Sequence, residues 1–304
     1  MAIHNWRASK LKIKTVILSS GIILLLFFCL IWFITVSSQI ISTQSFEPIE
    51  AVLKDANKDT LVIFDVDDVL IMSTNQAFQR PTDENFLNEI FLDLKTRFGE
   101  EKTDLLESII LLQETVQLVD PKIVSLINTL QIKGVPIIGL TAMSTGAYGK
   151  IQSIEDWRIQ KLESMGINLN RYWGNLKSKQ FSDFNIKDLK DGPVFKAGIL
   201  FSAKVPKGEA LQAFLQYVKL KPSKIIFVDD LSKNVKSVQR FCNKAGIEFI
   251  GFEYLGAYVR AEPVNKIRVH LQYEVLEKEH KWLSDKEADR RLNDSKKSLG
   301  LLVK

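Results

Sequence analysis

The chain has 304 residues, of which 46% are hydrophobic and 25% are charged. These values are ordinary for a globular protein and argue against bulk disorder, and the length allows one large domain or two modest ones. The net charge of +5 does not indicate a nucleic-acid partner, because the basic excess lies in a short leader and not on a clustered face. With Cys29 inside an apolar run, Cys242 alone cannot form a disulfide framework or a cysteine-based zinc site.

Residues 1–14 contain four basic residues and no acidic residue, and residues 15–36 form an uncharged, strongly apolar run. A helix of about 20 apolar residues spans a bilayer. Because positive residues stay on the cytoplasmic side, we expect a cytoplasmic leader followed by a single-pass signal anchor in the cytoplasmic (inner) membrane, with the remainder extracytoplasmic or periplasmic. Cleavage near Val36, among small residues, is the alternative, and it would release a secreted protein.

Residues 37–58 have no clear periodicity, and we expect a polar linker there. Beyond this segment the sequence contains short apolar runs that are rich in Val and Ile. These runs lie at residues 61–64, 135–140, 224–228 and 247–251. Such short runs, bounded by turn residues, are typical of strands buried on both faces of a sheet.

Helical patterns separate these runs, with apolar residues at helical spacing in residues 121–130, 208–218 and 235–245. Alternation of strands and helices predicts a Rossmann-like α/β fold, with a parallel sheet and helices on both faces. We expect this domain to cover residues 59–262.

Three stretches do not fit the simple alternation. Residues 71–120 contain more helical sequence than one crossover needs, so we expect a helical cap inserted after the first strand. Residues 171–203 are aromatic and turn-rich and indicate a hairpin-like excursion. Residues 263–304 are strongly charged, and we expect one or two C-terminal helices there with faces exposed to solvent.

Polar side chains follow three of the predicted strands directly. In chain order these are Asp65, Asp67 and Asp68 after the first strand, Thr141 after the second, and Asp229 with Asp230 after the third. One such aspartate is often only a helix N-cap or turn residue. Because ligands of open parallel sheets bind at the carboxyl ends of the strands, three clusters in succession favour a functional site.

The residue types suggest a chemistry for this site. Clustered carboxylates repel one another unless a hard cation such as Mg²⁺ neutralises them. One carboxylate can attack phosphorus, and a second can protonate the leaving group and then deprotonate water. A hydroxyl and a lysine can hold the phosphoryl oxygens.

These motifs resemble those of the haloacid dehalogenase-like superfamily. The stretch from Asp65 to Leu70 resembles the first motif, and Thr141 the second. Lys207, at a predicted helix start, resembles the third, although a surface lysine is common in such a place. Asp229 and Asp230 resemble the fourth motif in its double-aspartate form.

The resemblance implies a role for each residue. Asp65 would be the nucleophile, and Asp67 the general acid and base, with its backbone carbonyl on the metal. Thr141 and Lys207 would bind the phosphoryl group. The implied Mg²⁺ ligands are Asp65, Asp67, Asp229 and Asp230. Asn234 either assists this set or is an ordinary residue of the following helix.

The implied activity is Mg²⁺-dependent hydrolysis of a small phosphomonoester through an aspartyl-phosphate. The predicted location is similar to that of the extracytoplasmic acid phosphatases of this superfamily, and the layout resembles an uncharacterised bacterial family of the same fold. Their second motif usually continues with Gly-Arg, whereas Ala142 and Met143 follow Thr141 here. The alternative is a catalytically inactive interaction module at the membrane. In either case we expect membrane attachment through the N-terminal helix and no nucleic-acid partner.

Overall fold

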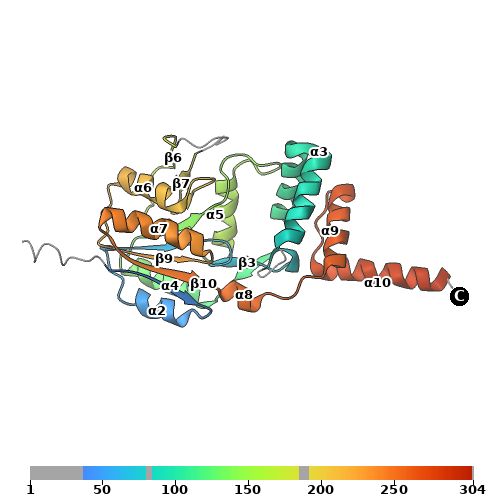
Figure 1. Cartoon of the computed structure of the whole chain (residues 1–304), viewed down its shortest axis with the longest axis horizontal. Coiled ribbons are helices and arrows are strands. Elements are labelled where there is room, and N and C mark those ends of the chain that lie inside the picture. The colour runs from blue at the N-terminus through green and yellow to red at the C-terminus, as the bar shows by residue number, and fades with distance from the viewer. Residues whose placement is uncertain (1–36, 80–83, 185–191, 303–304) are drawn as a thin grey trace, which may run out of the picture. The chain divides into compact units, whose positions relative to one another are not determined.

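The computed structural model describes residues 37–79, 84–184 and 192–302 (Figure 1). The predicted leader and signal anchor at residues 1–36 lie outside these ranges. Within the described ranges no helix combines the length and the apolar character needed to cross a bilayer.

An eight-stranded sheet forms the centre of the fold. Its strands follow the spatial order β1 (Ser38–Thr43), β10 (Glu248–Tyr254), β9 (Lys224–Asp229), β2 (Thr60–Phe64), β5 (Ile137–Thr141), β8 (Ile199–Phe201), β7 (Val194–Lys196) and β6 (Lys179–Gln180). In this spatial order, β1, β10, β9, β2, β5 and β8 each pair in parallel with the next strand. Only β7 and β6 add antiparallel pairs, at one edge of the sheet. The prediction of an α/β fold with a mostly parallel sheet is therefore confirmed.

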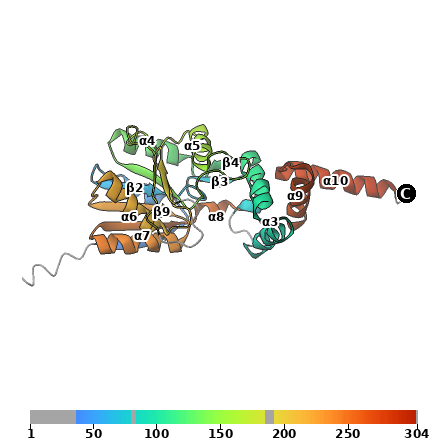
Figure 2. The same cartoon turned by 90° about the horizontal axis from the view of Figure 1, so that it is seen from above.

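Alternation of side chains along the strands supplies two cores. In β2, Val62 and Phe64 belong to one hydrophobic cluster, whereas Leu61 and Ile63 belong to another. This follows from the two-residue repeat of a strand. The first cluster includes residues of α2 (Glu47–Leu53), α4 (Lys122–Ile132) and α5 (Ile154–Ser164), and the second includes residues of α6 (Lys207–Val218) and α7 (Ser232–Ala245). Helices therefore cover both faces of the sheet (Figures 1 and 2).

The prediction of a linker at residues 37–58 is wrong, because most of this segment is part of the fold. Strand β1 pairs with β10 at the sheet edge, and Ile40 and Ile41 pack into opposite cores. Helix α2 buries Ile49 and Leu53, which are one helical turn apart. Strand β1 has only two strongly apolar residues and α2 only three, too few to stand out among the polar residues around them.

Residues 71–120 form a ribbon and a long helix. Strands β3 (Ile71–Ser73) and β4 (Val116–Leu118) pair antiparallel, and a short 3-10 helix, η1 (Gln76–Phe78), follows β3. Helix α3 (Glu84–Gln113) is interrupted at Gly99, whose φ of 76° lies in the left-handed region that favours glycine. The helical content agrees with the sequence pattern, and the function of this segment as a cap stays a prediction.

The charged C-terminal residues form two helices, α9 (Lys266–Glu279) and α10 (Asp285–Leu302), preceded by the short α8 (Gly256–Arg260). They are not simply solvated, because α9 packs Val269, Tyr273 and Leu276 against apolar residues of α3. Periodicity within a charged sequence did not reveal this buried face.

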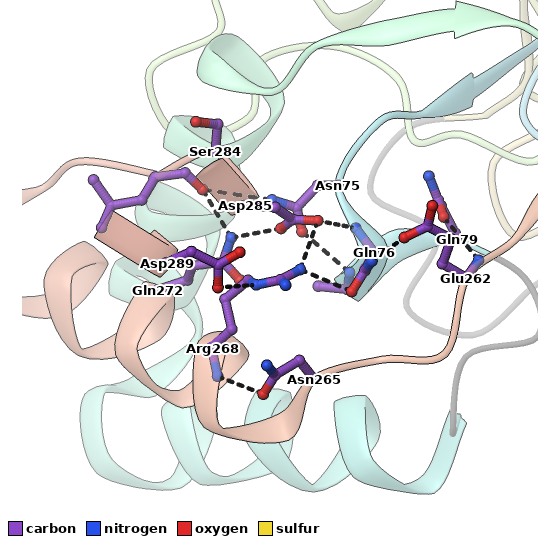
Figure 3. A network of polar contacts seen from close by, with 12 residues as sticks. Asn75, Gln76, Gln79, Glu262, Asn265, Arg268, Gln272, Ser284, Asp285 and Asp289 are labelled. Carbon is purple, nitrogen blue, oxygen red and sulfur yellow. Dashed lines mark hydrogen bonds and ion pairs between the residues drawn. The ribbon is translucent and has the colours of Figure 1, made fainter. Parts of the chain in front are cut away.

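A polar network joins the C-terminal helices to η1 (Figure 3). Arg268 of α9 lies 3.1 Å from Asp285 and 2.8 Å from Asp289 of α10. Asp285 also accepts a hydrogen bond from the backbone N–H of Gln76 at 3.0 Å. These contacts attach α9 and α10 to the segment that leads from β3 into α3.

Candidate functional site

Three buried carboxylates meet at the carboxyl ends of neighbouring strands. Asp65 follows β2 directly, Asp229 is the last residue of β9, and Asp230 comes next. Strands β2 and β9 are hydrogen-bonded neighbours in parallel register. Each aspartate therefore offers an oxygen atom that lies within 4.8 Å of those of the other two. The structure brings together three of the four predicted metal ligands.

Lys207 closes this cluster from the first turn of α6. Its side chain is only 2% exposed, and its Nζ lies 2.8 Å from Oδ2 of Asp65 and 2.6 Å from Oδ2 of Asp229. Gly208 helps to place it, because a Cβ at that position would lie 2.3 Å from the backbone oxygen of Ser237 in α7. The two helices approach closely only without that atom, and the alternative of a surface lysine is excluded.

The second oxygen of Asp229 is fixed by the start of α7. Oδ1 accepts a hydrogen bond from the backbone N–H of Leu231 at 2.9 Å and another from the side-chain amide of Asn234 at 3.0 Å. Asn234 therefore orients an acidic residue of the cluster, which answers the question that the sequence left open. The feature of the sequence that pointed to Asn234 was its position in the first helical turn after Asp229 and Asp230.

Burial dominates the electrostatics of this cluster. It raises the pKa of Asp65 well above the ordinary value, and the charges of Asp229 and Asp230 raise it further, while Lys207 opposes both effects. Burial by itself would lower the pKa of Lys207, but Asp65 and Asp229 raise it above its ordinary value, so the ammonium stays charged. Three carboxylates around one ammonium leave excess negative charge in a desolvated place.

Asp67 lies apart from this cluster. Its side chain is 52% exposed and pairs with the guanidinium of Arg158 at 3.0 Å. The turn that carries it is tight, because Asp68 has a φ of 60° and its backbone N–H donates to the oxygen of Ile71 at 2.7 Å. Aspartate tolerates this left-handed conformation better than most residues other than glycine. The sequence analysis expected the backbone carbonyl of Asp67 to bind the metal, and that expectation stays a prediction.

Arg158 is a residue that the sequence analysis missed. It lies on α5 with a 3% exposed side chain, and among the described residues its Nε has no hydrogen-bond partner. A weak signal was available, because Ile154, Arg158 and Leu162 share one face of the helix and both neighbours are buried. A guanidinium within an apolar stripe indicates a specific partner, and here that partner is Asp67.

Thr141 ends β5, on the other side of β2 from β9, and its side chain is buried. Its Oγ1 accepts a hydrogen bond from the backbone N–H of Met143 at 3.1 Å. Ser202 follows the neighbouring strand β8, donates its N–H to the oxygen of Thr141 at 2.8 Å, and has a buried Oγ without a hydrogen-bond partner in the described ranges. Two hydroxyls therefore stand at the ends of β5 and β8, the two strands that follow β2 in the sheet order, and only that of Thr141 was predicted.

A pocket of about 380 Å³ opens next to Asp67. Its lining comes from the turn after β2, from β3 and η1, from both halves of α3, from Glu114 and β4 after that helix, from the loop before α5 and from α5 itself. The three clustered aspartates and Lys207 do not line this pocket, but Asp67 and Arg158 do, so a molecule bound there reaches Asp67, which is two residues after Asp65.

Comparison with known proteins gives a family assignment. Residues 42–289 match the model of a family described as "Protein of unknown function (DUF2608)". The chain belongs to this family. An uncharacterised protein of Rickettsia prowazekii (strain Madrid E) is 27% identical to this DUF2608 member over 276 residues, which cover 89% of this chain and 97% of that protein. A Chlamydia pneumoniae protein, whose name assigns it provisionally to the outer membrane, is 25% identical over 238 residues, with coverage of 75% and 83%.

One similar solved structure is a haloacid dehalogenase-like family hydrolase from Streptococcus pneumoniae. It is 14% identical with a TM-score of 0.32, and the match covers 70% of this DUF2608 chain and 98% of that protein.

Proposed function

We propose that this protein is a Mg²⁺-dependent phosphomonoesterase that works through an aspartyl-phosphate on Asp65. The observation that carries the proposal is the meeting of Asp65, Asp229 and Asp230, all buried, with the ammonium of Lys207 paired to the first two. The resemblance of their sequence motifs to the haloacid dehalogenase-like superfamily supports the same activity.

The carboxylate cluster fits a hard divalent cation. Carboxylate oxygens from Asp65, Asp229 and Asp230 are the ligand type that Mg²⁺ prefers. When all three carboxylates are ionised, their charge exceeds that of Lys207 by two, which equals the charge of a divalent ion, and such an ion would favour the ionised form of Asp65. A bound ion would supply charge neutralisation for the cluster and for an incoming phosphate group.

Hydrolysis would take two steps. A carboxylate oxygen of Asp65 forms a bond to phosphorus while the ester P–O bond breaks, and the leaving oxygen takes a proton from Asp67. Asp67 then removes a proton from water, which attacks phosphorus, releases inorganic phosphate and regenerates the carboxylate of Asp65. Lys207 and the hydroxyl of Thr141 would hold phosphoryl oxygens during both steps.

The cellular location that we infer is the bacterial envelope. The basic leader and the apolar run at residues 15–36 support a single-pass anchor in the cytoplasmic membrane with the enzyme outside the cytoplasm. The name of the chlamydial relative also supports an envelope location. Secretion after cleavage of the leader is the alternative.

The test is release of phosphate from an aryl phosphate by the purified full-length chain. We expect turnover with Mg²⁺ and its loss both in EDTA and in Asp65→Asn. Asp59→Asn is the matched control, because Asp59 is exposed just before the opposite end of β2. Full turnover in Asp65→Asn would reject the mechanism. Failure of Mg²⁺ both to stabilise the protein and to support turnover on a broad panel of phosphate esters would favour the inactive interaction module.

A further inference from the structure

The pocket beside Asp67 has features that hydrolysis at Asp65 does not require. Most of its lining is apolar, including Phe78, Phe91, Ile110 and Met143. Bare phosphate needs no such wall, because apolar surface gains free energy only by covering apolar parts of a ligand. The pocket therefore suits an organic leaving group with a hydrocarbon body.

Two glutamates interrupt this apolar lining. Glu107 lies in α3, and Glu114 directly follows the last residue of that helix, with its backbone N–H donating to the oxygen of Ile110 at 2.8 Å. Both glutamates line the pocket. The hydroxyl of Tyr148 donates a hydrogen bond to Glu107, and that of Ser73 donates one to Glu114 at 3.1 Å. In the described part of the chain no lysine or arginine forms an ion pair with either carboxylate.

The local backbone keeps Glu107 in place. Gly149 has a φ of 52°, and a Cβ there would lie 2.3 Å from Oγ of Ser108. The glycine thus lets the loop that carries Tyr148 close onto α3. The next residue, Lys150, donates its backbone N–H to the same Ser108 hydroxyl at 2.9 Å. The hydrogen bonds from Tyr148 to Glu107 and from Lys150 to Ser108 therefore hold the loop against the helix.

Burial makes both carboxylates costly as isolated anions. Desolvation raises the pKa of Glu107, with Tyr148 opposing the shift, and it raises the pKa of Glu114 to about 7, with the bond from Ser73 opposing it. A cationic ligand group would relieve this cost, because an opposite charge nearby favours the ionised carboxylate.

Beside Asp67 the pocket instead has a buried cation with one N–H that no described residue accepts. Arg158 is buried there, and its Nε has no hydrogen-bond partner among the described residues. An ester or phosphate oxygen would supply one. The pocket thus offers the guanidinium of Arg158 beside Asp67, together with the carboxylates of Glu107 in α3 and of Glu114 just after that helix.

We propose that the pocket selects phosphate esters of amino alcohols, with the ammonium group at Glu107 and Glu114 and an ester oxygen at Arg158. The inference rests on the proposed phosphomonoesterase activity. It adds the class of leaving group, which the strand-end motifs do not encode.

The test compares two esters of equal shape, phosphocholine and its uncharged isostere neohexyl phosphate, with the full-length chain in Mg²⁺. We expect kcat/KM to favour phosphocholine at least tenfold, and this preference to fall to about twofold or less in the double variant Glu107→Gln/Glu114→Gln. The control is Glu101→Gln, an exposed position on α3, which should keep the wild-type preference.

Binding of choline alone provides a readout that does not depend on turnover. Choline should raise the midpoint of thermal unfolding of the wild-type chain and of Glu101→Gln but not of either single variant, Glu107→Gln or Glu114→Gln. Hydrolysis of aryl phosphate without any preference for phosphocholine would overturn this inference and leave the phosphomonoesterase proposal intact. A preference that survives in the double variant would also overturn it. Absence of all turnover, with choline binding that needs both glutamates, would instead overturn the phosphomonoesterase and support the ammonium site.

Discussion

Replacement of Lys207 by methionine tests the electrostatics of the carboxylate cluster directly. Methionine keeps a straight apolar side chain of similar length, so the change removes the ammonium and leaves almost no cavity. The variant retains Asp65, Asp229 and Asp230 but leaves them without the cation that lies 2.6 to 2.8 Å from two of them.

The expected loss of stability follows from burial. Removal of one partner from a buried, hydrogen-bonded ion pair costs about 3–5 kcal/mol, because the remaining charge stays desolvated. Lys207 is 2% exposed, and its two partners are 10% exposed or less, so solvent provides little screening. We therefore expect Lys207→Met to lower the free energy of unfolding by about 3–5 kcal/mol in metal-free buffer at neutral pH.

Urea denaturation in EDTA, followed by circular dichroism, measures this loss. Lys224→Met is the matched control, because Lys224 pairs with Glu248 at 2.9 Å while both side chains are about one-third exposed. Such a surface pair contributes about 0–1 kcal/mol. A loss below about 1 kcal/mol for Lys207→Met, equal to that of the control, would refute the argument for a buried, charge-coupled cluster.

Three further predictions concern the frame around the site. Gly208→Ala should cost about 1–3 kcal/mol of unfolding free energy in urea, since the new methyl would press on the backbone of Ser237, and a neutral effect would contradict the close approach of α6 and α7. Glu287 and Ser284 cap the start of α10, and hydrogen bonds from the side chain and the backbone of Ser284 lower the pKa of Glu287 to about 2. The stabilisation by this cap should therefore be fully present above pH 4.5 and be lost as the pH falls toward 2. Amide exchange of α10 measures this change, and Glu287→Gln should abolish its pH dependence. Arg268→Met should speed amide exchange in α10 but not in α4, because the network in Figure 3 loses its central donor, and unchanged exchange would show that the network does not hold α10.

The sheet was predictable wherever strands are buried on both faces. The runs that became β2, β5 and β9 are continuous and apolar, as a parallel strand covered by helices requires, and the run of β10 is interrupted only by Glu248. Strand β1 failed this criterion, since an edge strand with Ile40 and Ile41 needs only one apolar residue for each core. Its position depends on pairing with β10, a partner about 200 residues away along the chain, which local periodicity cannot detect.

In the site, too, some residues could be predicted from the sequence and others could not. Asp65 and Asp229 could be proposed together because parallel strands deliver their following residues to one edge of the sheet, whatever their separation in sequence. Lys207 was supported only by motif order, and its burial came from the contact between α6 and α7. Arg158 and the pocket glutamates had no motif, because their positions depend on how two helices lie around the turn after β2.

Different parts of the molecule carry the reaction and the selectivity for the leaving group. The carboxylate cluster is held by backbone geometry, since its members follow adjacent strands whose register is fixed by hydrogen bonds. Glu107 instead belongs to α3, a helix outside the sheet that is interrupted at Gly99, and Glu114 follows the last residue of that helix. A change of side chain on α3 can therefore alter which leaving group fits without moving Asp65, whereas any change that shifts β2 against β9 must alter the reaction itself. For this reason the strand-end motifs indicate a reaction, and the substrate has to be inferred from the charges and walls of the pocket.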